Sequence, residues 1–261
     1  MSRVLATVAL VFSFGLPAAA DDAPTYSAAS IVNAADSQTT TLAPNVIATI
    51  YGTGLSYVTL ALRSSDMRGD ELPNVLSGSG VWVLVGGVTA NIYYVSPTQI
   101  NFLVPASFQP TASNVQVVRD GTSGPLIPVR IAASAPALFQ MDAQNAIATR
   151  PDGSLLTPAA PATPGGIVIL YGTGLGQTVP AAVFGQIPRE AAQVKQIAAF
   201  QIILDGVPVD STNILYAGLA PGFAGLYQIN LRIPTGTGPS PEIRIGYPDA
   251  LSKTGVHLLI N

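Results

Sequence analysis

The sequence predicts an all-β protein built from two similar β-sandwich domains, and two observations carry that prediction. The motif Tyr-Gly-Thr-Gly-Leu at 51–55 returns at 171–175, and the spacing, 171 − 51 = 120 residues, is the length of a small domain. In addition, 25 Gly and 22 Pro separate short runs rich in Val, Ile, Thr and Tyr, a composition typical of strands joined by tight turns. With 261 residues, each half is long enough to bury a core of its own.

The N-terminal residues 1–20 have the pattern of a secretory signal peptide. Arg3 supplies a basic start, residues 4–16 form an apolar run, and Ala18-Ala19-Ala20 resembles a cleavage site. The apolar run is shorter than the roughly 20 residues that a membrane span requires. We therefore expect cleavage after Ala20 and a chain that is secreted, periplasmic or held at the cell surface, with no membrane span after cleavage.

Residues 21–139 are predicted to form the first domain. Apolar or alternating runs bounded by turn residues predict strands at 31–35, 46–51, 81–85, 88–94, 99–104, 114–118 and 125–132. Gly86-Gly87 and residues 119–122 are typical hairpin turns. Six or seven short strands with such turns between them indicate a sandwich. The segment 135–139 is expected to end this domain.

Residues 140–261 are predicted to form the second domain, because the same events recur in the same order. Strands are expected at 167–171, 200–204, 213–216 and 228–233. The spacing between the copies grows to 228 − 99 = 129 residues, mainly through a longer loop at 217–226. A short helix is expected within 180–196. Insertions confined to turns are typical of a duplicated domain.

Several blocks together resemble one known family. They are residues 31–35, the two Tyr-Gly-Thr-Gly-Leu motifs, 93–102, 135–139 and 215–230. In combination they resemble the C-terminal domain found on many secreted proteins of Solibacter-type acidobacteria, and each half is similar to immunoglobulin-like domains of the TIG/IPT type. The resemblance implies two tandem immunoglobulin-like β-sandwich domains, and it implies no catalytic residue or cofactor.

Charge and cysteine content exclude several function classes. The formal net charge is −3, and loss of Arg3 with the signal peptide leaves 10 − 14 = −4. Because Lys and Arg are scattered rather than clustered, nucleic-acid binding is disfavoured. The absence of Cys excludes disulfides, thiol catalysis and thiolate metal ligands.

No motif indicates a catalytic, cofactor or metal site. The glycines at 172–176 suggest a phosphate-binding loop, but Gln177 stands where the third Gly of a dinucleotide motif is needed, so a strand-ending turn is the better interpretation. His257 is the single histidine and lies in an alternating apolar segment without a nucleophile elbow nearby. Asp66, Asp70 and Glu71 could offer oxygen ligands to Ca²⁺, yet their spacing fits no calcium loop.

Aromatic residues near the repeated Gln-Ile-Asn segments are the candidate ligand-binding residues. These are Tyr93, Tyr94, Tyr216, Phe223 and Tyr227. Tyrosine combines a large apolar ring with a polar tip, which suits a sandwich core as well as a sugar-binding or protein-binding surface. The repeated amides are interpreted as buried groups that tie a loop to a strand, with ligand contact as the alternative.

The leading functional hypothesis is a non-catalytic interaction or adhesion module for an extracellular protein or polysaccharide. The alternative is a carbohydrate-binding protein that uses exposed tyrosines and the 217–226 loop. A hydrolase with paired carboxylates is the third hypothesis. A structural subunit that assembles by strand addition at sheet edges is the fourth.

Overall fold

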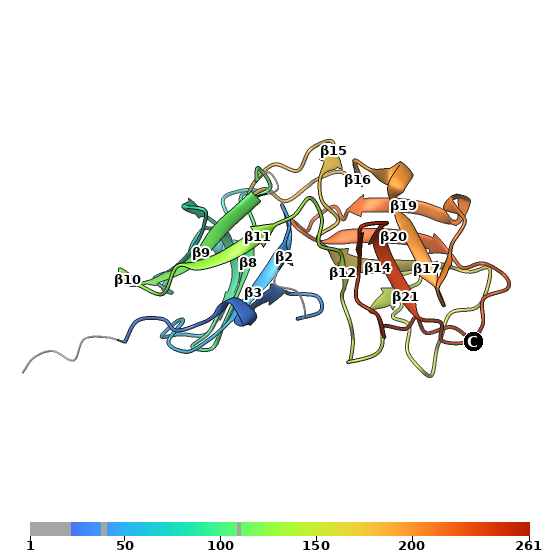
Figure 1. Cartoon of the computed structure of the whole chain (residues 1–261), viewed down its shortest axis with the longest axis horizontal. Coiled ribbons are helices and arrows are strands. Elements are labelled where there is room, and N and C mark those ends of the chain that lie inside the picture. The colour runs from blue at the N-terminus through green and yellow to red at the C-terminus, as the bar shows by residue number, and fades with distance from the viewer. Residues whose placement is uncertain (1–21, 38–40, 109–110) are drawn as a thin grey trace, which may run out of the picture.

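A computed structural model describes residues 22–37, 41–108 and 111–261, so the predicted signal peptide lies outside the described residues. The chain is all-β and forms two immunoglobulin-like sandwiches, which lie side by side along the long axis of the molecule (Figure 1). The described helical segments are three-residue 3₁₀ turns: η1 (Ala28–Ser30), η2 (Ser64–Asp66), η3 (Ile197–Ala199) and η4 (Ser211–Asn213). Within the described ranges, no helix has the length and apolar character to cross a membrane.

The first sandwich consists of two mainly antiparallel sheets that enclose one core. The first sheet has the order β1-β3-β8-β7-β4, with β1 (Ile31–Asn33), β3 (Ile47–Tyr51), β8 (Gln99–Leu103), β7 (Asn91–Val95) and β4 (Leu60–Ala61). The second has the order β2-β11-β9-β5-β6, with β2 (Thr41–Leu42), β11 (Ile127–Ile131), β9 (Thr111–Arg119), β5 (Val81–Val85) and β6 (Val88–Thr89); β10 (Thr122–Ser123) pairs with β9.

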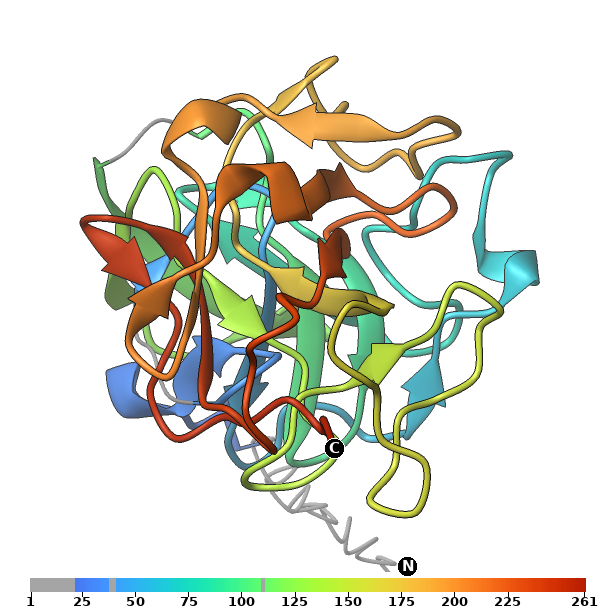
Figure 2. The ribbon, with the colours of Figure 1, turned by 90° about the vertical axis from the view of Figure 1, so that its right-hand side faces the viewer.

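The second sandwich repeats this arrangement. Its larger sheet has the order β12-β14-β20-β19-β16-β15, with β12 (Ala137–Leu138), β14 (Ile167–Thr173), β20 (Tyr227–Arg232), β19 (Ile214–Leu219), β16 (Ala192–Val194) and β15 (Thr178–Val179); β13 (Ala148–Thr149) pairs with β14. Its smaller sheet has the order β18-β17-β21-β22, with β18 (Val207–Pro208), β17 (Gln201–Leu204), β21 (Ile243–Tyr247) and β22 (Ala250–Leu251). The neighbours β3-β8-β7 thus correspond to β14-β20-β19. Figure 2 shows the second sandwich from its outer end.

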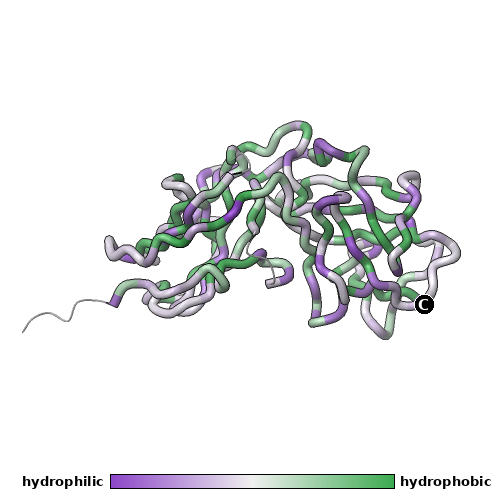
Figure 3. Tube along the Cα trace, in the orientation of Figure 1, coloured by the Kyte–Doolittle hydropathy of each residue, from purple (hydrophilic) through white to green (hydrophobic). Residues whose placement is uncertain are grey.

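Alternation along the strands sorts side chains into an inner and an outer face. In β3, Ala48 and Ile50 point into the core, and in β8 their neighbours Ile100 and Phe102 do the same with no exposed surface. The hydrophobic stretches of the chain accordingly follow the strands of both sandwiches (Figure 3). The strand residues that alternate with these buried ones, such as Tyr51 after Ile50, must face outward because successive side chains alternate.

The repeated motif ends a central strand in each sandwich, as expected for a structural turn. Gly174 has a φ of 78°, and a Cβ at this position would lie 2.0 Å from the carbonyl oxygen of Ala135. A side chain there is therefore excluded both by backbone conformation and by contact. The motif needs its glycines to fit the chain that packs beside it.

Three features differ from the sequence predictions. The segment 88–94 is not one strand, because β6 pairs with β5 whereas β7 crosses to the other sheet and pairs with β8. The short helix expected within 180–196 is wrong, since β16 lies there and the preceding segment is irregular. Segment 135–139, expected to end the first domain, contributes β12, which pairs with β14 of the second sandwich. The division into 21–139 and 140–261 stays a prediction, and we propose that the second domain begins before β12.

The loop at 220–226 joins the two sandwiches by packing on the outer face of the β3-β8 pair. A Cβ on Gly225 would lie 2.6 Å from Leu103 and 2.8 Å from Ile47, so the loop backbone is in direct contact with both strands. The hydroxyl of Tyr93 donates to the carbonyl oxygen of Ala224 at 2.8 Å. The insertion that distinguishes the second copy therefore serves as an interdomain contact.

Thr173, the last residue of β14, joins the end of β14 to the start of β3 at the same junction. Its Oγ1 accepts from the backbone amide of Ile47 at 3.0 Å and donates to the carbonyl oxygen of Gly225 at 2.7 Å. The side chain is fully buried, so both hydrogen bonds are shielded from water.

A second contact is made by the segment between β15 and β16, which reaches over to the first sandwich (Figure 1). The amide of Leu72 donates to the carbonyl of Gly185 at 2.7 Å, and the amide of Ile187 donates to the carbonyl of Asp70 at 2.9 Å. Leu72 is buried there in a cluster with Leu103 and Ala224. Residues 56–79 and 217–226, the regions where the copies differ most, thus meet at one junction.

Candidate functional site

The five aromatic residues predicted to bind a ligand occupy different settings. Tyr227 is fully buried, its hydroxyl donates to the carbonyl of Gly176, and burial raises the pKa of that hydroxyl. The Tyr93 hydroxyl makes the interdomain hydrogen bond to the carbonyl of Ala224, and burial raises its pKa as well. Phe223 is 62% exposed on the loop that packs at the junction. Tyr94 and Tyr216 lie on the outer faces of two different sheets.

The outer face of the first sandwich gathers tyrosine rings and side-chain amides. Tyr51 lies opposite Gln99, and Asn101 lies between Thr49 and Tyr94 on the neighbouring strands. Asn101 Oδ1 accepts from Gln99 Nε2 at 2.9 Å and from Thr49 Oγ1 at 3.0 Å. We call Tyr51, Tyr94, Gln99 and Asn101 the first tyrosine–amide face. Tyr51 is 41% exposed, and the other three residues of this face are partly exposed.

The second sandwich carries the same arrangement at the corresponding positions. Tyr171 lies opposite Gln228, and Asn230 lies opposite Tyr216. Asn230 Oδ1 accepts from Gln228 Nε2 at 2.8 Å, which repeats the amide pair of the first sandwich. All four residues are partly exposed. Tyr171, Tyr216, Gln228 and Asn230 form the second tyrosine–amide face.

The tyrosines of the second face are held more firmly than those of the first. The Tyr216 hydroxyl donates to the carbonyl of Leu219 at 2.8 Å, and its ring end lies over Gly218, where a Cβ would come within 2.4 Å of the hydroxyl. Burial also raises the pKa of Tyr216. The Tyr171 hydroxyl lies 3.1 Å from Thr149 Oγ1. These contacts fix the orientation of both rings on the sheet.

Tyr94 and Tyr216 are among the residues predicted from the sequence to bind a ligand, and this stays a prediction. Tyr51, Tyr171 and the outward orientation of both amide pairs were not predicted. The signal was present in the period-two alternation. Ile100 and Ile229 are the buried residues of the two Gln-Ile-Asn segments, so the flanking Gln and Asn face outward. Alternation does not show that the Tyr of each Tyr-Gly-Thr-Gly-Leu motif lies opposite the Gln of the Gln-Ile-Asn segment in the same sandwich. That pairing depends on strand register.

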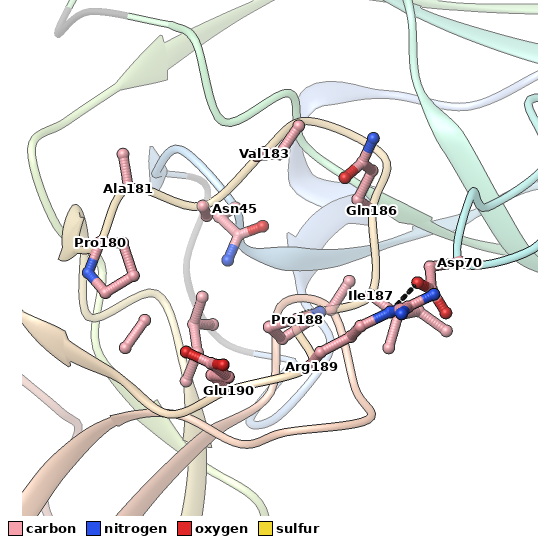
Figure 4. A pocket seen from close by; sticks show the side chains of 14 residues that line it. Asn45, Asp70, Pro180, Ala181, Val183, Gln186, Ile187, Pro188, Arg189 and Glu190 are labelled. Carbon is pink, nitrogen blue, oxygen red and sulfur yellow. Dashed lines mark hydrogen bonds and ion pairs between the residues drawn. The ribbon is translucent and has the colours of Figure 1, made fainter.

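A cavity of about 330 Å³ lies beneath the segment that crosses between the sandwiches (Figure 4). Asn45 lines it from the first sandwich, and mainly apolar side chains of 180–188 line it from the second. Arg189 and Asp70 form an ion pair at its edge, where both side chains are substantially exposed. The Asn45 side-chain nitrogen is buried without a hydrogen-bond partner among the described residues.

Two of the three acidic residues considered for Ca²⁺, Asp66 and Asp70, have other partners. The amides of Arg63 and Ser77 donate to the Asp66 carboxylate, and the Arg63 amide lowers its pKa most. Asp70 pairs with Arg189. His257 Nδ1 lies 2.9 Å from the carbonyl of Ser240, on a segment whose alternate residues are buried. No group of three His, Cys, Asp or Glu side chains within the described ranges is arranged to hold a metal ion.

Comparison with known proteins finds no matching family model and no matching curated sequence, so the resemblance to the acidobacterial domain family stays a prediction. Among solved structures, the chain is similar to a surface glycan-binding protein from a mixed-linkage glucan utilization locus of Bacteroides ovatus, solved with a mixed-linkage heptasaccharide. The TM-score is 0.35 and the identity 13%, over 93% of this chain and 47% of that one.

Two further structures show similar levels of likeness. A surface glycan-binding protein of Prevotella bryantii matches with a TM-score of 0.28 and 12% identity, over 89% of this chain and 41% of that one. Domains 5–6 of the S-layer protein SbsC match with a TM-score of 0.27 and 10% identity, over 84% and 91% of the respective chains. The chain spans less than half the length of the two glycan-binding proteins. Similarities this distant do not indicate a ligand.

Proposed function

We propose that the chain is a secreted, non-catalytic binding module in which two sandwiches hold matching surfaces in a fixed relation. The observation that carries the proposal is the junction. Thr173 bonds to both sandwiches' backbones from a buried position, and Leu72, Leu103 and Ala224 form a buried cluster beside it. Domain interfaces without such contacts permit relative motion, whereas this one favours a single rigid unit.

A rigid unit with two matching faces suits an extended ligand. Binding at one face raises the effective concentration of the same ligand at the other, so that two modest contacts give strong attachment. Because each face is built on strands rather than on loops, little side-chain or backbone ordering accompanies binding. This arrangement supports the interaction or adhesion hypothesis over the hydrolase hypothesis, since attachment requires presentation of a surface and no reacting groups.

The test is a retention assay on the mature chain, residues 21–261. Purified protein is incubated with insoluble polysaccharides (cellulose, chitin and xylan), with peptidoglycan sacculi, and with immobilised collagen and fibronectin. Retention on at least one material, without release of reducing sugar or peptide, is the expected result. Release of soluble product would indicate a hydrolase, and absence of retention on every material would contradict the proposed function.

A further inference from the structure

The tyrosine–amide faces combine three properties that bear on ligand chemistry. The first is an uncharged lining: Tyr51, Tyr94, Gln99 and Asn101 carry no formal charge at neutral pH, and neither do their counterparts on the second face. The nearest charge on either pair of central strands is Arg232, two residues beyond Asn230. This lining favours a neutral ligand, because none of the Tyr, Gln and Asn side chains that form the two faces compensates an ion.

The second property is unused hydrogen-bonding capacity. In each amide pair one bond joins the Gln Nε2 to the Asn Oδ1. The remaining amide atoms have no protein partner among the described residues, and each side chain is partly exposed, so these atoms can reach a ligand. They are Gln99 Oε1, Asn101 Nδ2, Gln228 Oε1 and Asn230 Nδ2. Each face therefore offers at least one free acceptor oxygen and one free donor nitrogen, held in place by the bond between the two amides. A hydroxyl group donates and accepts, so it can satisfy both.

The third property is that tyrosine rings lie on the two strands that flank the strand with the amides. Tyr51 on β3 and Tyr94 on β7 flank Gln99 and Asn101 on β8, and β14 and β19 supply Tyr171 and Tyr216 beside β20. Tyrosine offers a large contact area at low conformational cost. A pyranose ring has apolar C–H faces and hydroxyl edges, so it fits ring contact beside a donor and an acceptor.

Resting on the proposed function, we propose that both tyrosine–amide faces bind neutral polysaccharide through the same constellation. The duplication supports a repeating ligand, because a polymer presents the same unit to each face. Both the position of each residue and the amide hydrogen bond are repeated across the two sandwiches, at 2.9 Å and 2.8 Å. The structural role expected for these amides, tying a loop to a strand, does not account for their bonding to each other on an exposed face.

The experiment is affinity electrophoresis of the mature chain through gels that contain one soluble polysaccharide each. The neutral probes are mixed-linkage β-glucan, xyloglucan, galactomannan and dextran, and the acidic probes are polygalacturonate and alginate. We expect retardation by at least one neutral probe and by neither acidic probe. Retardation by acidic probes alone, or by no neutral probe, overturns the inference.

Variants assign the binding to the faces. Tyr51→Ala with Tyr171→Ala should weaken binding to the retarding probe at least about tenfold, a typical effect of truncating an anchoring aromatic residue. Tyr51→Phe with Tyr171→Phe should retain most of the affinity, because ring contact is kept. Trp82→Ala is the matched control, since Trp82 is 37% exposed on the outer face of the other sheet of the first sandwich.

The outcomes separate this inference from the proposed function. If the double Ala variant, shown to be folded by its unchanged thermal unfolding, binds as strongly as the parent chain, the faces are not the site. If the chain is retained only on collagen, fibronectin or sacculi, the binding function holds and the polysaccharide inference fails. If Trp82→Ala weakens binding and the double Ala variant does not, the site lies on the other sheet of the first sandwich.

Discussion

The two sandwiches use the same outer sheet face differently beyond the tyrosine–amide positions. In the first sandwich, Leu103 is buried where the loop at 220–226 packs on it, and neighbouring Ile47 packs against the same cluster. In the second, the corresponding residues of the β14-β20 pair are Ile167 and the exposed Arg232. This part of the outer face is therefore covered by the junction in the first sandwich, whereas it is exposed in the second. At these corresponding positions, the apolar Leu103 lies in an interface and the charged Arg232 lies on a free surface.

Exchanging the apolar and the charged residue at these corresponding positions should give the largest change in the free energy of unfolding. Leu103→Arg places a charge in the buried cluster beside Leu72 and Ala224. We expect a loss of about 3 kcal/mol or more in the free energy of unfolding, because an unpaired charge is desolvated. Urea unfolding measures it. The matched variant Arg232→Leu, at the open position, should change the free energy of unfolding by no more than about 0.5 kcal/mol. Equal effects of the two variants would show that the faces do not differ in this way.

The two threonines of the repeated motif sharpen the same comparison. Thr173 is buried and hydrogen-bonded at the junction, whereas Thr53 in the first copy is exposed. Thr173→Val leaves the amide of Ile47 and the carbonyl of Gly225 without their partner, so we expect a loss of about 1–3 kcal/mol in the free energy of unfolding. Thr53→Val should be nearly neutral. A neutral Thr173→Val would mean that the junction does not depend on these hydrogen bonds.

The fold class, the duplication and most strands could be predicted from the sequence, because repetition and alternation are local signals. The junction could not, since it depends on which surfaces of two folded domains come together. For the same reason the sequence does not show that the hydroxyls of Tyr93 and Tyr227 have partners within the protein. Each has a hydroxyl partner remote in sequence, Ala224 and Gly176, and no local pattern reveals such a partner. The pairing of Tyr51 with Gln99 could not be predicted either, because the two residues are 99 − 51 = 48 positions apart and their pairing depends on strand register.

The smallest effect concerns the Tyr93 hydroxyl and its pH dependence. Burial raises the pKa of Tyr93 above its ordinary value of about 10. The protonated hydroxyl therefore stabilises the folded chain fully below that ordinary pKa, and the stabilisation falls as the pH rises toward the folded pKa. Tyr93→Phe should cost about 1 kcal/mol at pH 7 through the lost bond to Ala224. That difference between variant and parent should shrink at about pH 10.5. An unchanged difference at both pH values would contradict the assignment.

The central claim, that the junction holds the two sandwiches as one rigid unit, is tested most directly by an interdomain distance distribution. The native chain has no Cys, so Leu126→Cys and Val207→Cys provide two label sites, at positions that are 59% and 67% exposed in the first and second sandwich. Double electron–electron resonance between spin labels at these sites should give one narrow distance peak. Thr173→Val should broaden that peak. A broad or multiple distribution in the parent chain would contradict the rigid arrangement.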